Sequence, residues 1–311
     1  MFQLYAAIWR VSSGRQIVLI LLSLAIAFLA AVPLEFQKDI VNLLTENEIN
    51  EEDLFWYCLF MMLAILLSLG LKWMMGYRSG LLGEDIIRLI RTRLVEGAIT
   101  AEAEGSGLRK GTLSTAVSAE AEELGKFAGA AISEPVVQIG TLVSVIGFIA
   151  TSQPGLGTIA LMMILPQIVI VLVTQAKVNQ YVAERVRVLR KATDQLTARD
   201  VQEAEEAVKA HFDEIYQARR HMFIWKLSTK FLLSTINGAG TVAVLLLGGW
   251  LVIEGKTDIG TVVAATIGLG RIQAPTAFLI AFYRQVSANR IKYELLRELF
   301  DAQTAGTRAS G

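Results

Sequence analysis

The chain has 311 residues, of which 53% are hydrophobic and 19% charged, and its 29 basic residues balance its 29 acidic residues. This apolar content excludes an ordinary soluble domain and indicates an integral membrane protein. The zero net charge gives no electrostatic reason to expect a nucleic-acid partner. The single cysteine, Cys58, excludes an internal disulfide and a cysteine-rich metal site.

Apolar segments of membrane-spanning length run through the chain. Residues 1–15 mix aromatic, apolar and polar side chains, which predicts an elbow helix at the membrane interface. The segments that follow each approach the ~20 residues that a helix needs to cross about 30 Å of hydrocarbon. They cover residues 17–41, 54–75, 135–151, 156–174, 231–253 and 259–282. We therefore expect an all-α membrane protein with six transmembrane helices within residues 1–300, followed by a flexible tail, 301–311.

The connections between these spans differ greatly in length. Residues 45–53, 152–155 and 254–258 form short turns, whereas residues 76–134 and 175–230 form long polar segments with helical periodicity. Helical arms of about 20 residues would project roughly 30 Å from the membrane. Two such pairs of arms predict a docking surface for a partner; the alternative is a solvated hairpin without a partner.

The basic residues indicate the orientation of the chain. Both long connections are rich in Arg and Lys, whereas the turn 45–53 carries only acidic charges. Because positively charged loops stay in the cytoplasm, we expect both long connections and both termini on that side.

Arg271 is a charged residue well inside the sixth span. A charge at this depth is unfavourable unless it faces a cavity or a partner. Four residues share its helix face by their spacing: Pro275, Phe278, Phe282 and Gln285. This face either lines a pathway in which Arg271 attracts an anionic or zwitterionic group, or it holds a structural salt bridge to Glu35 or to an acid of a partner chain.

Three glutamines inside the spans are further pathway candidates: Gln138, Gln167 and Gln273. Gln273 falls roughly opposite Arg271 on its helix. Such amides also form hydrogen bonds between helices, which is the alternative for each. Pro33 and Pro275 lie within predicted spans, where proline bends or ends a helix, and are candidate hinges.

No set of residues predicts catalysis on this chain. His211 and His221 lie ten residues apart, on different faces of a predicted helix, and lack partners at metal spacing. Gly255-Lys256-Thr257 approaches a phosphate-binding loop, but Trp250 stands where that loop needs its first glycine. We expect this chain to bind no metal or cofactor.

Several short patterns resemble a known family. The last two spans contain Gly248-Gly249-Trp250-Leu251, Asp258-Ile259-Gly260-Thr261 and Pro275, and Ala288-Asn289-Arg290-Ile291 follows them. With the order of the spans and the loop lengths, these residues resemble the transmembrane domain of the ATP-binding cassette (ABC) exporters, the type IV fold. Residues 111–117 are similar to the first coupling segment of that family, although Glu120 stands where the family usually has Asp.

The resemblance implies a non-catalytic permease subunit of an ATP-driven exporter in the bacterial inner membrane. A second transmembrane subunit, identical or related, would complete it, and the two would work by alternating access in the lipid bilayer. ATP and Mg would bind a separately encoded ATPase subunit, because the chain stops at Gly311 without a nucleotide-binding domain.

The resemblance also assigns residues to coupling with the ATPase. The first coupling segment would contain Gly111, Thr112, Leu113, Ser114, Thr115 and Val117. The second long connection is about 12 residues shorter than in typical members, on ordinary helix geometry. We therefore place the second coupling segment only loosely, around residues 196–206, with Leu196, Asp200 and Glu203.

Two other functions stay open at this point. The chain could be a scaffold or sensor that binds a cytoplasmic partner without transport, although a scaffold has little use for Arg271. It could also be an importer built on the exporter fold, because fold does not fix direction. The substrate does not follow from the sequence.

Overall fold

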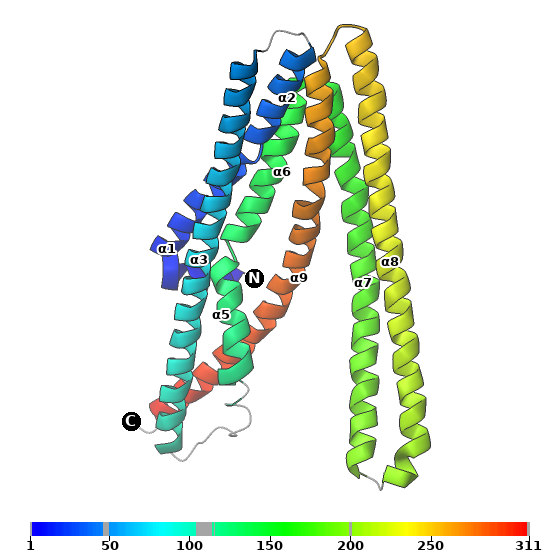
Figure 1. The fold of residues 1–311 in the computed structure, drawn as a ribbon. Helices are drawn as coiled ribbons and strands as arrows, with labels where there is room; N and C mark the ends of the chain where they lie inside the picture. Colours follow the sequence, from blue (N-terminus) through cyan, green and yellow to red (C-terminus); the bar gives the residue numbers. More distant parts are fainter. Residues whose placement is uncertain (1, 46–49, 104–113, 115, 199–200, 310–311) are drawn as a thin grey trace. The chain divides into compact units, whose positions relative to one another are not determined.

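A computed structural model describes residues 2–45, 50–103, 114, 116–198 and 201–309 (Figure 1). These residues are almost entirely helical and include no strand, which confirms the all-α prediction. Six helices are long and apolar enough to cross a membrane. The chain folds as two units: Met1–Ser152 with Asp258–Gly311, and Gln153–Thr257.

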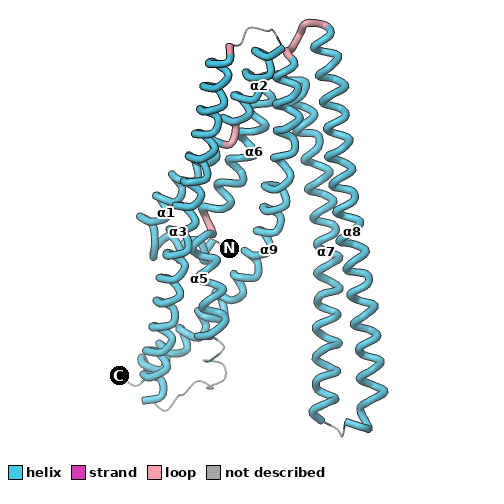
Figure 2. The backbone as a smooth tube through the Cα atoms, viewed as in Figure 1, coloured by secondary structure: helices cyan, strands magenta, loops and turns pink. Residues whose placement is uncertain are grey.

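The first unit consists of long helices and two short helical segments. They are α1 (Phe2–Leu29), α2 (Val32–Thr45), α3 (Glu51–Ala103), the π-helix η1 (Ala116–Glu120), α5 (Ala121–Ala130), α6 (Ser133–Ser152) and α9 (Ile259–Ala309). Figure 2 shows that α3 runs without interruption, whereas turns separate α1 from α2 and α5 from α6. The 53 residues of α3 give about 80 Å of helix. This length is expected of a helix that crosses a membrane and continues into an arm.

The first predicted span is divided by local backbone geometry. Ser12 has a non-helical φ of −139°, which kinks α1 where the elbow segment meets the span. A turn at Ala30 and Ala31 then ends α1. Pro33 stands in the first turn of α2, where its missing N–H leaves no hydrogen bond unmade. The proline therefore begins a new helix instead of bending a continuous one.

Glycines allow α3 and α5 to pack closely. A Cβ atom at Gly125 would lie 3.0 Å from the Gly83 carbonyl oxygen and 3.0 Å from the Ile87 nitrogen. A Cβ atom at Gly129 would lie 3.0 Å from the Gly83 nitrogen and would also meet the Ser79 carbonyl. No side chain fits at these distances, so the contact depends on small residues, as in many membrane helix pairs.

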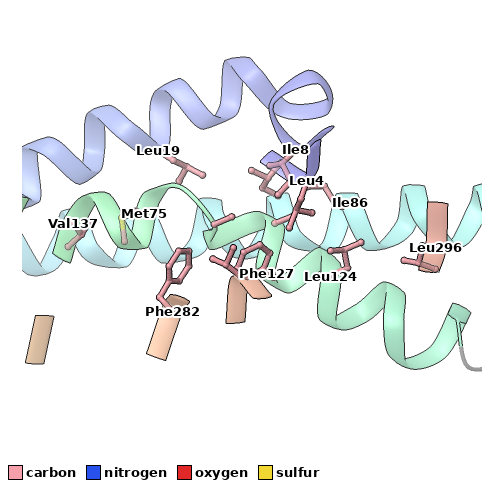
Figure 3. Close-up of a cluster of buried hydrophobic side chains, with 14 of the residues drawn as sticks. Leu4, Ile8, Leu19, Met75, Ile86, Leu124, Phe127, Val137, Phe282 and Leu296 are labelled. Atoms are coloured by element: carbon pink, nitrogen blue, oxygen red, sulfur yellow. The ribbon is translucent and has the colours of Figure 1, made fainter. Parts of the chain in front are cut away.

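Buried apolar side chains from α1, α3, α5, α6 and α9 form one hydrophobic cluster (Figure 3). The elbow segment contributes Leu4 and Ile8, so apolar contacts hold it against the rest of the unit. Phe282 stacks on Phe127 and on Phe278, with ring centroids 5.8 Å apart in each pair. α9 continues through Ala309.

The second unit is a hairpin of α7 (Pro154–Ala198) and α8 (Val201–Ile253). Both helices pass from an apolar span into a polar arm without interruption. Polar pairs join them along the arm: Thr174 and Thr229 share a hydrogen bond, and His221 stacks on Tyr181 at 5.4 Å. The hairpin thus has specific contacts along its length.

A glycine cap closes α8. Gly255 has a φ of +68°, its N–H donates to the Val252 carbonyl at 2.9 Å, and Lys256 N–H donates to the Leu251 carbonyl at 2.9 Å. This pair of hydrogen bonds is the Schellman motif. Gly255-Lys256-Thr257 therefore ends a helix and does not have the geometry of a phosphate-binding loop.

Candidate functional site

A cavity of about 690 Å³ lies in the first unit, between α1, α2, α3, α6 and α9. These helices belong to segments that are apolar enough to cross a membrane. Part of its lining is nevertheless polar, namely Ser68, Lys72, Glu134, Gln138, Thr141 and Arg271. Ionisable residues placed inside spanning helices usually mark a functional site.

Arg271 is half-buried at this cavity. Its Nη1 donates a hydrogen bond to the Ala30 carbonyl at 3.2 Å. That carbonyl belongs to the turn between α1 and α2. In a continuous helix it would accept a hydrogen bond from Leu34 N–H, but Leu34 N–H donates to the Ala31 carbonyl. The break in the first span thus supplies an acceptor for the charge in the last span.

The salt bridge to Glu35 that the sequence left open is not formed among the described residues. The Glu35 carboxylate accepts a hydrogen bond from Lys38 at 3.1 Å. One guanidinium has five N–H donors, and the carbonyl of Ala30 uses one of them. The remaining donors of Arg271 are available to a ligand in the cavity.

Sequence reasoning missed Lys72 and Glu134, which also line the cavity. Neither residue forms an ion pair within the part of the chain that the structure describes. Lys72 lies inside the second apolar span, so it carried the same signal as Arg271. Glu134 comes just before the third predicted span, where it resembled an ordinary boundary residue.

The cavity therefore combines two cationic groups with one carboxylate. Hydrogen-bonding groups from Ser68, Gln138 and Thr141 stand beside them. The net positive charge favours a ligand with a carboxylate or phosphate, since guanidinium and ammonium groups bind these anions through charge-assisted hydrogen bonds. The carboxylate of Glu134 can accept hydrogen bonds from a cationic or hydroxyl group of the same ligand.

Some of the predicted pathway residues meet at this cavity and others do not. Gln138 and Pro275 line it with Arg271, and so does Pro33, which was predicted only as a hinge. Phe278 and Phe282 are absent from its lining, because Phe282 stacks on Phe127 and on Phe278 in the hydrophobic core. The helix face predicted from spacing is thus shared between a cavity and a packed core.

The remaining predicted pathway residues lie elsewhere. Gln285 is exposed on α9, and its carbonyl accepts a hydrogen bond from Asn289 at 2.9 Å. Gln273 is partly buried and does not line the cavity. Gln167 is buried on α7, in the second unit.

The predicted coupling residues are only partly described. Gly111, Thr112, Leu113, Thr115 and Asp200 lie outside the described residues. Leu196 lies in α7, Glu203 in α8, and Ser114 is exposed just before η1.

One member of the predicted first coupling segment, Val117, is anchored to α3. The Val117 carbonyl accepts a hydrogen bond from Arg91 Nε at 2.9 Å. Arg91 Nη2 also forms an ion pair with Glu122 Oε2 at 3.5 Å. The end of the segment is thereby tied to α3, so that a displacement of the segment would be passed to a spanning helix.

Residues 16–276 match the family described as the ABC transporter transmembrane region. The matched residues make up most of the chain and include the whole lining of the charged cavity. No curated protein matched the chain.

Proposed function

Since the chain belongs to the family of ABC transporter transmembrane regions, we propose that it is the permease of an ATP-driven exporter that works by alternating access. An ATPase subunit would supply the energy. A second six-helix subunit, identical or related, would complete the pathway. The observation that supports transport most directly is the cavity with charged residues between helices long and apolar enough to span a membrane.

The cavity would hold the substrate during transport. Its volume of about 690 Å³ falls within the about 300–1,000 Å³ that is usual for small-molecule sites. Arg271 and Lys72 would bind an anionic group, while Glu134 and Gln138 would orient the rest of the molecule. We therefore propose an anionic or zwitterionic substrate.

Alternating access requires helices that bend at fixed places. The described part of the first unit offers such places at the turn of Ala30 and Ala31, at the turn of Ala131 and Ile132, and at Pro275 within α9. Two of them, Ala30 and Pro275, line the cavity. A bend there would change the shape of the binding site directly, as hinge motions do in other proteins.

The helical arms would transmit the movement of the ATPase. We place its contacts at residues 111–117 and around residues 196–206, in a cytoplasm that also contains both termini. The bacterial inner membrane is the proposed location. The support for this orientation is the concentration of basic residues in the long connections.

Two alternatives remain distinct from this proposal. A membrane scaffold or sensor would also present arms to a partner, but it has no role for a cavity lined by Lys72, Glu134 and Arg271. An importer would use the same cavity in the reverse direction, which fold alone does not decide.

Co-purification tests the partner directly. The tagged chain, isolated from the membranes of its source in mild detergent, should bring down a protein that contains a phosphate-binding loop. ATP hydrolysis by that complex should rise when a transported anion is added. Recovery of a signalling protein without ATPase activity would support the scaffold and contradict the transporter.

A further inference from the structure

A second cavity lies beneath the elbow segment of α1. It has a volume of about 230 Å³ and is walled by α1, α3, α5 and α9, all of the first unit. It shares no lining residue with the charged cavity. Five of its lining residues appear in Figure 3, where they converge within the hydrophobic cluster: Leu4, Ile8, Ile86, Leu124 and Leu296.

The lining favours a hydrocarbon guest. Apart from Tyr293, Arg93 and Arg297, every lining residue is apolar. Leu4 and Leu296 are each only 2% exposed, so the walls belong to the packed interior. Apolar cavities of about 150 Å³ stay dry and bind benzene, and this cavity is larger. A guest would also restore the dispersion contacts that an empty cavity lacks.

One side of the cavity is charged and open. Arg93 and Arg297 line it, and both are exposed, as is Val11 at 52%. Arg297 Nη1 donates to Gln3 Oε1 at 3.2 Å, which holds this guanidinium against the elbow segment. Two guanidinium groups in this position can bind a carboxylate or a phosphate through paired hydrogen bonds.

We propose that this cavity binds one hydrocarbon chain of an anionic amphiphile, whose carboxylate or phosphate contacts Arg93 and Arg297. Such a ligand matches both parts of the site, since the apolar walls accept the chain and the exposed arginines accept the head. The ligand would join the elbow segment to α3, α5 and α9. Two sources offer this chemistry: an anionic phospholipid of the bilayer and a free fatty acid.

Photo-crosslinking in bilayer nanodiscs of neutral lipid tests the proposal. The purified full chain is exposed to three probes that carry a diazirine on the acyl chain: phosphatidylglycerol, phosphatidylcholine and a fatty acid. The anionic probes should label peptides that contain residues 4–11, 86–93 or 293–297. Labelling by phosphatidylglycerol indicates a bilayer lipid, and labelling by the fatty acid alone indicates a free acid.

Matched variants connect the labelling with the cavity. Ala7→Phe, which fills the cavity, should lower labelling by every bound probe, whereas Ala6→Phe places the same ring on a residue outside the lining. Arg93→Gln should reduce labelling by the anionic probes about tenfold, as expected for the loss of a charge-assisted hydrogen bond. Arg88→Gln, an exposed change on the same helix outside the lining, should leave it unchanged.

Three results would overturn the proposal. The first is labelling confined to peptides that do not line the cavity. The second is equal labelling by the phosphatidylcholine and phosphatidylglycerol probes. The third is an equal effect of Arg93→Gln and Arg88→Gln, which stays informative even if Ala7→Phe fails to fold, because Arg93 is exposed.

Discussion

Arg271 is the residue on which the substrate site depends most. Its single described hydrogen bond, to the Ala30 carbonyl, positions the side chain but does not neutralise it. We predict that Arg271→Ala lowers transport about tenfold, because one charge-assisted hydrogen bond to the substrate is lost. The yield of folded protein should change little. Substrate uptake per folded molecule in proteoliposomes measures the first effect, and size-exclusion chromatography measures the second.

The matched control for Arg271 is Arg290→Ala. Arg290 lies on the same helix and pairs with Glu294 at 2.7 Å, on the exposed surface. Its removal should leave transport unchanged. If Arg271→Ala instead reduced folded yield while transport per folded molecule stayed normal, Arg271 would have a structural role.

The second prediction at the residue scale concerns Asp258 and the stability of the protein in acid. Its carboxylate caps α9 by accepting hydrogen bonds from Thr261 N–H at 2.6 Å and from Asn42 at 2.8 Å. Burial by itself would raise the pKa of Asp258, but these hydrogen bonds outweigh burial and hold the pKa below its usual value. Such a lowered pKa contributes stability that is complete above the unfolded value of about 3.9. The contribution disappears as the pH falls through the folded pKa.

We therefore expect the unfolding temperature to fall as the pH drops below about 5, partly through Asp258. Asp258→Asn keeps an N-cap side chain but removes the charge, so it should change stability at neutral pH by less than about 1 kcal/mol and should weaken the acid dependence. Asp213→Asn changes an exposed carboxylate on α8 and serves as the control. Thermal unfolding of the purified proteins at several pH values gives the answer, and equal acid dependence in both variants would contradict the role of the cap.

At the scale of elements, the contact between α3 and α5 depends on glycine. A leucine at Gly125 would collide with the backbone of Gly83 and Ile87, which cannot move without separating the helices. We predict that Gly125→Leu destabilises the protein by about 2 kcal/mol or more. Gly80→Leu is the control on α3, since no atom lies within 4 Å of a Cβ there. Unfolding temperatures that fall equally in both variants would show that the close contact is not formed.

The proposed first coupling segment, residues 111–117, is expected to connect ATP hydrolysis to the cavity. Bulky or charged residues at Gly111, Leu113 and Ser114 are predicted to uncouple the two, because they would disturb the surface presented to the ATPase. Hydrolysis should continue while transport falls. The ratio of substrate moved to ATP hydrolysed is the measurement, and an unchanged ratio would remove residues 111–117 from the docking surface.

The all-α fold with six membrane-spanning helices was predictable, because apolar length is a local property of the sequence. The division of the first span was only partly predictable: Pro33 indicated a bend or an end, but not the turn at Ala30 and Ala31. The break between α5 and α6 had a similar partial signal, because Pro135 stands in the first turn of α6 as Pro33 does in α2.

The site was predictable to a smaller extent. Arg271, Pro275 and Gln138 were identified because polar residues and prolines are unusual in spans. Helical spacing also placed Phe278 with Arg271, yet Phe278 stacks in the core. Spacing defines a helix face but not what covers each part of it. Tertiary packing also decides that Lys72 reaches the same cavity.

For the whole molecule, the central claim is that this ABC transporter subunit moves an anionic or zwitterionic substrate through the charged cavity. The family match covers most of the chain, and the cavity places Lys72, Glu134 and Arg271 between helices long and apolar enough to cross a membrane. The most direct test reconstitutes the chain with its co-purified ATPase in proteoliposomes. ATP-driven movement of a labelled anion or zwitterion is then followed with the native chain and with a double Lys72→Met and Arg271→Met variant.

The account predicts ATP-dependent movement with the native chain and a loss of at least about tenfold in the double variant, with the ATPase still bound. Transport by the double variant at the native rate would contradict the proposed site. Vesicles in which ATP drives no movement of any tested anion or zwitterion, although the complex is intact, would contradict the central claim.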